Sequence, residues 1–185
     1  MSRIPTPATI EDAPQAAHDL LYAVKAKIGQ VPNLYRLTAT SPATLGGLLS
    51  LSGALGDGAL SPALREQIAL TVANVNGCGY CNAAHGFIGK QMLKLDDDTI
   101  AAAREGRASD PKADAALRFA RKVAVSRADV SDADVAEVRA AGFSDAELVE
   151  IVGHVALNTL TNYLNEVFGT EIDFPAAPTA TRLAA

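Results

Sequence analysis

Apolar residues in this chain recur every three to four positions, and no stretch alternates convincingly between apolar and polar residues. Leu64, Ile68 and Val72 are spaced by four, and the segment 144–168 carries a broad apolar face with a period near 3.6. This spacing is typical of helices that bury one face, whereas a half-buried strand alternates with period two. We therefore predict an all-α fold with little or no sheet.

Serine-proline pairs mark two of the predicted helix starts. Ser41-Pro42 and Ser61-Pro62 each place a serine at the N-cap and a proline at the first helical position, where a missing N–H costs nothing. From these signals and the apolar spacing we predict helices at about 12–29, 42–56, 62–75, 79–94, 97–105, 112–126, 132–141 and 144–168.

Length and composition favour one domain of closely packed helices. The chain has 185 residues, 49% of them hydrophobic, with only 5% aromatic and no Trp. A domain typically takes about 100–200 residues, and abundant alanine suits helices because it loses no rotamer freedom there. We predict one domain over 1–175, made of an N-terminal helical arm (about 1–57) and a core that contains the cysteines (about 58–170). The Pro/Ala/Thr-rich tail 176–185 is expected to be loose.

Charge and hydropathy argue against nucleic acid and membrane partners. The formal net charge is −5 and the basic residues are scattered, whereas nucleic-acid binding needs a clustered basic surface. No apolar stretch approaches the roughly 20 residues of a membrane span. The N-terminus, Met-Ser-Arg-Ile-Pro, lacks the basic and apolar regions of a signal peptide. We therefore expect a cytoplasmic protein.

The two cysteines of the chain stand in the run Cys-Gly-Tyr-Cys-Asn-Ala-Ala-His at residues 78–85. Cys78, Cys81 and His85 share one face of a helix, and the Asn-Gly pair before them is a natural end for the preceding helix. The positive end of the new helix favours a thiolate. We expect Cys78 to be the more exposed thiol and His85 to take the proton of Cys81. Glu66 reaches His85 if the two helices pack antiparallel.

Other interpretations of these residues stay open. The two cysteines, His85 and Glu66 are also four potential zinc ligands, although structural zinc usually draws on two separated ligand pairs. The cysteines could also be buried and inert. We favour redox chemistry, with no metal and no cofactor.

Further polar residues are candidates for the walls of a pocket. Tyr80, between the cysteines, either walls the site or simply packs. His154, Asn158, Asn162 and Asn165 follow one another along the last predicted helix. They either line a pocket opposite the cysteines or are satisfied polar groups of the core.

The order Glu66, eleven residues, Cys-x-x-Cys, three residues and His85 resembles the motif of the AhpD-like proteins in the carboxymuconolactone decarboxylase superfamily. Three stretches resemble the peroxidase-related branch of that superfamily: Gly-Gln-Val-Pro-Asn at 29–33, Asn-Tyr-Leu-Asn at 162–165 and Glu-Ile-Asp-Phe-Pro at 171–175. The resemblance implies an AhpD-like helical bundle that assembles into trimers or hexamers.

The resemblance also implies roles for the site residues. Cys81 would be the nucleophile, Cys78 the resolving thiol that meets a partner peroxiredoxin, His85 the base and Glu66 the relay carboxylate. Tyr80 stands where the best-known member has a second histidine, and a phenol is a poor base at neutral pH. We predict a thiol-dependent alkyl hydroperoxidase. The alternatives are a disulfide-exchange partner of a peroxiredoxin, without peroxidase activity, and a zinc-binding structural protein.

Overall fold

The computed structural model describes residues 2–175, and this part of the chain is a single all-helical domain without strands, as predicted. The elements are, in chain order, the 3-10 helix η1 (Gln15–Ala17) and the α-helices α1 (His18–Ile28), α2 (Asn33–Thr38), α3 (Pro42–Gly56), α4 (Pro62–Asn76), α5 (Gly79–Gln91), α6 (Asp97–Arg104), α7 (Pro111–Ser126), α8 (Asp132–Ala140) and α9 (Asp145–Phe168).

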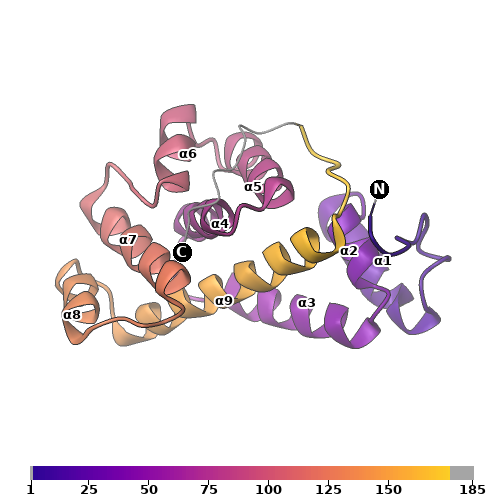
Figure 1. Ribbon diagram of the computed structural model, residues 1–185, viewed down its shortest axis with the longest axis horizontal. Helices are drawn as coiled ribbons and strands as arrows, with labels where there is room; N and C mark the ends of the chain where they lie inside the picture. Colours follow the sequence, from indigo (N-terminus) through magenta and orange to yellow (C-terminus); the bar gives the residue numbers. More distant parts are fainter. Residues whose placement is uncertain (1, 176–185) are drawn as a thin grey trace.

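Helix α4 is the centre of the fold. It packs against α5, α6, α7 and α9. The long helix α9 runs from α8 at one end of the molecule to α2 at the other, with α3 beside it (Figure 1). Helices α4 and α5 lie over this long helix, so the site that they carry faces α9.

The side chains of α4 are buried over most of its length. Ile68, Leu70 and Val72 are fully buried, together with Leu117 of α7 and Ile151 of α9. Burying one such side chain contributes about 1.5–3 kcal/mol relative to leaving it exposed. Helix α4 is therefore a rigid support for the residues that it presents to α5.

The predicted helix starts at the serine-proline pairs are confirmed. The Ser41 side chain accepts the Thr44 N–H, the Ser61 side chain accepts the Leu64 N–H, and a proline opens each helix. Each cap satisfies one of the backbone N–H groups that a helix start leaves without an internal partner.

The structure differs from the predicted helices in three places. Helix α2 was missed, because six residues are too few to show a periodic apolar face. The predicted helix 12–29 begins at His18, since a proline and the 3-10 turn η1 precede it. The predicted helix 79–94 ends at Gln91, and the chain then turns through Lys94 with a left-handed φ of 58°.

The predicted tail, 176–185, lies outside the described residues, and the division into an arm and a core stays a prediction. Within the described part, no helix is both long and apolar enough to cross a membrane.

Candidate active site

The turn between α4 and α5 places both cysteines at the start of α5. Gly77 ends α4 with a left-handed φ of 68°, a conformation that glycine adopts without steric cost. Cys78 is the N-cap of α5, and its Sγ accepts the backbone N–H of Cys81 at 3.1 Å. The motif therefore opens a new helix, as the sequence predicted.

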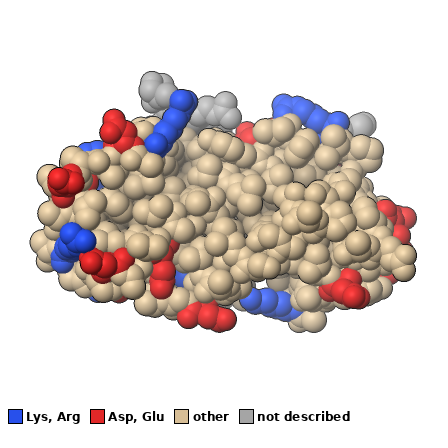
Figure 2. Space-filling model, turned by 90° about the horizontal axis from the view of Figure 1, so that it is seen from below, with Lys and Arg blue, Asp and Glu red and all other residues tan. Residues whose placement is uncertain are grey.

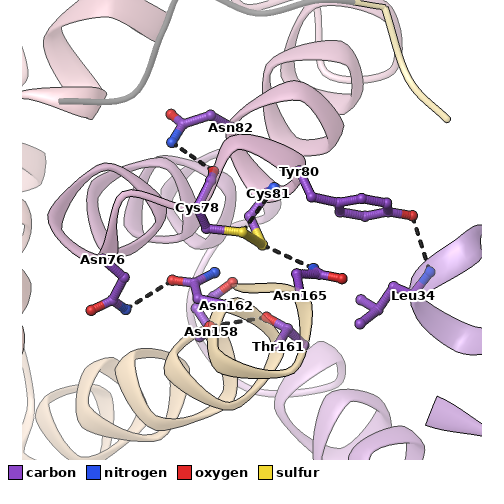
Figure 3. The surroundings of a disulfide bond; sticks show 10 residues. All are labelled: Leu34, Asn76, Cys78, Tyr80, Cys81, Asn82, Asn158, Thr161, Asn162 and Asn165. Carbon is purple, nitrogen blue, oxygen red and sulfur yellow. Dashed lines mark hydrogen bonds between the residues drawn. A yellow bond between two sulfur atoms is a disulfide. The ribbon is translucent and has the colours of Figure 1, made fainter. Parts of the chain in front are cut away.

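Cys78 and Cys81 form a disulfide (Figure 3), with their Cα atoms 5.3 Å apart. Cys78 is 0% exposed and Cys81 is 3% exposed. The prediction that Cys78 is the more exposed thiol was wrong. As the N-cap, its side chain turns back over the first turn of α5 and joins a buried cluster with Ala73 of α4, against which Leu164 of α9 packs.

The structure brings Glu66 of α4 to His85 of α5, because the two helices fold back on one another. Nδ1 of His85 lies 2.8 Å from Oε1 of Glu66. Burial of the imidazole lowers its pKa, but the charge of Glu66 and the hydrogen bond to it outweigh burial, so the pKa of His85 is raised. With Nδ1–H donated to the carboxylate, Nε2 is the ring nitrogen that can exchange a proton. Cys81 lies one helical turn before this imidazole.

Two asparagines of α9 face the cysteine pair (Figure 3). Asn165 Nδ2 donates to Cys81 Sγ at 3.2 Å, and Asn162 Oδ1 accepts from Asn76 Nδ2 of α4 at 2.9 Å. Of the polar residues singled out on α9, Asn165 is the one that donates a hydrogen bond to a cysteine. Asn158 instead donates to the backbone oxygen of His154 at 2.8 Å, within the same helix.

Asn82, in α5, holds the backbone of the motif. Asn82 is fully buried, and its Nδ2 donates to the Cys78 carbonyl oxygen at 3.1 Å. Arg104 Nε of α6 donates to Asn82 Oδ1 at 3.2 Å. Neither residue could be found from the sequence, because the partners of Asn82 depend on the packing of α6 against α5 and Arg104 is distant in sequence.

Tyr80 belongs to the same buried cluster as the cysteines and holds the segment that follows α9. Its hydroxyl donates to Asp173 Oδ1 at 2.7 Å and accepts the Leu34 N–H at 3.2 Å. The Phe174 ring packs edge-on against Tyr80, with the ring centroids 5.7 Å apart. Burial and the neighbouring Asp173 raise the pKa of Tyr80 far above its ordinary value. A phenol that stays protonated is no base, which leaves His85 as the candidate base of the motif.

The described residues show no metal centre: among them, no group of three or more His, Cys, Asp and Glu side chains is placed to hold a metal ion. The site instead combines two sulfurs that can be oxidised and reduced, a histidine-carboxylate pair that can move a proton, and an amide donor at one sulfur. This set suits thiol-disulfide chemistry.

Comparison with known proteins agrees with the motif. Residues 42–126, which include the whole of it, match the carboxymuconolactone decarboxylase family. No curated protein sequence matches the chain.

Solved structures similar to the chain cover nearly all of it. One is a peroxidase-related protein with an alkylhydroperoxidase AhpD core from Ralstonia eutropha JMP134, with a TM-score of 0.82, 28% identity, and 93% of this chain and 92% of that chain covered. Another is a peroxidase-related protein from Silicibacter sp. TM1040, with a TM-score of 0.80, 24% identity, and 98% and 95% covered.

The debrominase Bmp8, solved in complex with 2,3,4-tribromopyrrole, shares the fold at a TM-score of 0.78 and 22% identity, with 94% of each chain covered. The family match spans Glu66, both cysteines and His85, and the AhpD-core structure extends the similarity over the whole bundle. The motif's resemblance to the AhpD-like proteins of the carboxymuconolactone decarboxylase superfamily is therefore supported by the family match over residues 42–126 and by the similarity to the AhpD-core structure.

Proposed function

We propose that the protein is a thiol-dependent alkyl hydroperoxidase that cycles Cys78 and Cys81 between dithiol and disulfide. The observation that carries the proposal is a disulfide close in sequence to a histidine-carboxylate pair: Oε1 of Glu66 lies 2.8 Å from Nδ1 of His85, and His85 follows Cys81 by one helical turn. A nucleophile, a base and a group that orients the base are the components that activated-thiol enzymes combine.

In the proposed cycle the Cys81 thiolate attacks the terminal oxygen of the hydroperoxide. The S–O bond forms as the O–O bond breaks, the sulfur is oxidised to a sulfenic acid, and the alkoxide leaves as an alcohol with a proton from His85. The Cys78 thiol then displaces water from the sulfenic acid to form the disulfide. An external thiol reductant, such as a peroxiredoxin system or another dithiol, returns two electrons and two protons.

Burial of both sulfurs favours a small substrate over direct exchange with a protein disulfide. A hydroperoxide needs only a narrow opening to reach a sulfur that is 3% exposed, whereas a protein partner must bring its own sulfur into contact. Disulfide exchange without peroxidase activity is therefore the second candidate, and it requires the buried cluster around the sulfurs to open first. We place the protein in the cytoplasm, where thiol reductants keep such pairs reduced.

The test is to mix the reduced protein with one equivalent of cumene hydroperoxide and to follow its intact mass and free thiols over time. We expect both thiols to disappear rapidly and the mass to fall by that of two hydrogen atoms. If the thiols do not react with the hydroperoxide but the protein reduces an added protein disulfide, the result would contradict the peroxidase function and support disulfide exchange. Thiols that react only after chelation would favour zinc binding.

We also propose that the protein is a homo-oligomer, a trimer or hexamer as the motif's resemblance implies. Helix α9 carries an exposed apolar stripe made of Val149, Val152, Leu160, Tyr163 and Val167. The face seen from below in Figure 2 is largely free of charged side chains across its middle. Exposed apolar patches such as the stripe on α9 mark protein-protein contacts in soluble proteins.

Charges placed on this stripe are expected to separate the subunits. The double variant Val149→Glu, Tyr163→Glu should shift the protein to the mass of a single chain in size-exclusion chromatography with light scattering, because an interface core does not tolerate unpaired carboxylates. Met92→Glu is the matched control, since Met92 and Val149 are both 71% exposed but Met92 lies at the end of α5, off the stripe. A wild-type protein that elutes as a single chain would contradict the proposal.

A further inference from the structure

The Cys81 sulfur meets a polar side chain from the opposite wall of the site. Asn165 of α9 points at the disulfide, with Nδ2 3.2 Å from Cys81 Sγ (Figure 3). Asn165 is 2% exposed and Cys81 is 3% exposed. Water therefore does not compete for this hydrogen bond, and a bond in such surroundings is stronger than one at the surface.

Chemistry fixes which end of the amide faces the sulfur. A disulfide or thiolate sulfur offers only lone pairs, so it can accept a proton from Nδ2 but would repel the carbonyl oxygen. The Oδ1 atom of Asn165 is buried and has no hydrogen-bond partner in the described structure. A buried acceptor without a donor costs stability. If Asn165 only filled space, an apolar side chain would do so without the cost of a buried, unpaired oxygen. The hydrogen bond to the sulfur is therefore the interaction that an asparagine provides here and an apolar residue does not.

The backbone of Asn165 is held in place by the end of α9. Its carbonyl oxygen accepts two N–H groups, those of Gly169 and of Thr170, the second at 3.0 Å. Gly169 takes the left-handed φ of 61° that closes the helix. The amide therefore extends toward the sulfur from a fixed position, which is what a preorganised donor requires.

The other sulfur has a donor of a different kind. Cys78 Sγ accepts the backbone N–H of Cys81, at the positive end of α5. That donor favours negative charge on Cys78. Among the described residues, Asn165 supplies the side-chain donor that favours charge on Cys81 instead. The amide thus bears on which of the two sulfurs is ionised in the reduced protein.

We propose that Asn165 is a catalytic residue that stabilises the Cys81 thiolate by donating its amide N–H to the sulfur, and so makes Cys81 the attacking sulfur. A hydrogen bond to an ionised acceptor is roughly twice as strong as one to a neutral acceptor, so the contact favours the thiolate over the thiol. Its effect on ionisation needs no substrate, while its consequence for turnover rests on the proposed hydroperoxidase function.

The test compares Cys78→Ser with Cys78→Ser, Asn165→Leu. The chain has two cysteines, so either protein contains Cys81 as its sole thiol. Thiolate formation is followed by absorbance at 240 nm against pH, and by the rate of alkylation with iodoacetamide. Leucine keeps the volume and removes the donor. We expect the midpoint of thiolate formation to move to higher pH and the alkylation rate at pH 7 to fall about tenfold.

Asn158→Leu in the same background is the matched control. Asn158 is also a buried asparagine of α9, but its Nδ2 donates to His154 O rather than to sulfur. The control should keep both the midpoint and the alkylation rate within twofold of the parent. Asn165→Asp, which keeps the shape and loses the donor, serves if the leucine variant does not fold in thermal unfolding.

An unchanged midpoint in the Asn165 variant that folds, or an equal shift in the Asn158 control, would overturn the proposal even if the wild-type protein consumes hydroperoxide. Conversely, the titration can succeed where the peroxidase assay fails, because it uses no hydroperoxide. In the protein with both cysteines, Asn165→Leu should slow hydroperoxide consumption about tenfold at pH 7 and recover at higher pH. A residue that only supported the fold would not give this recovery.

Discussion

Replacing Cys81 with serine is expected to abolish hydroperoxide turnover. A serine hydroxyl is not ionised at neutral pH and forms neither a sulfenic acid nor a disulfide, so the proposed first step has no substitute. The rate of hydroperoxide loss in the presence of a dithiol reductant should fall to that of the buffer. Near-wild-type turnover in Cys81→Ser would remove the basis of the proposed mechanism.

Replacing Cys78 with serine separates the two steps of the cycle. Cys78→Ser should consume one equivalent of hydroperoxide per chain and then stop, because the sulfenic acid on Cys81 has no neighbouring thiol to condense with. Trapping with dimedone, followed by peptide mass spectrometry, should place the adduct on Cys81. An adduct on Cys78 in the converse variant, together with an unreactive Cys81, would reverse the two roles.

Much of the fold could be predicted because its signals are local. Ser41 and Ser61 cap their helices through atoms three residues away, and the prolines that follow them need no tertiary context. Helix α2 was missed because its six residues contain less than two helical turns, and its position depends on contacts with α1, α3 and α9.

In the candidate site, too, local features could be predicted from the sequence and tertiary contacts could not. Glu66, the cysteines and His85 lie within twenty residues on two helices joined by a tight turn, so the sequence predicted that Glu66 reaches His85 if these helices pack antiparallel. The burial of Cys78 depends on α9, and the Asn165 contact with Cys81 joins residues 84 positions apart. No local pattern reports such contacts, because they arise only when α9 packs across the start of α5.

His85→Gln is expected to lower the rate constant for Cys81 oxidation roughly 10²- to 10⁴-fold, the range for loss of a general acid-base group. Glutamine keeps a polar side chain of similar reach but cannot take up or release a proton. Stopped-flow oxidation of the reduced protein by cumene hydroperoxide measures this rate constant directly.

Glu66→Gln tests how the relay is tuned. Burial lowers the pKa of His85 and Glu66 raises it by a larger amount, so removing the carboxylate charge leaves burial unopposed. The base form of His85 then persists to lower pH, and the acid limb of the pH-rate profile should move to lower pH. The rate should fall less than in His85→Gln, because a weaker base remains.

The difference in thermal stability between the wild-type protein and Glu66→Gln should depend on pH. Because the pKa of His85 is raised in the folded protein, its charged pairing with Glu66 stabilises the fold fully below the ordinary imidazole pKa of about 6.5, and this contribution is lost as pH rises through the raised value. The oxidised wild-type protein should therefore exceed Glu66→Gln in thermal unfolding temperature most at acidic pH, and least above neutral pH.

Glu137→Gln, which removes an exposed partner of Arg118, is the control for the pH-rate profile and should leave its acid limb unchanged. An acid limb that does not move in Glu66→Gln would show that His85 is not the group that governs the rate.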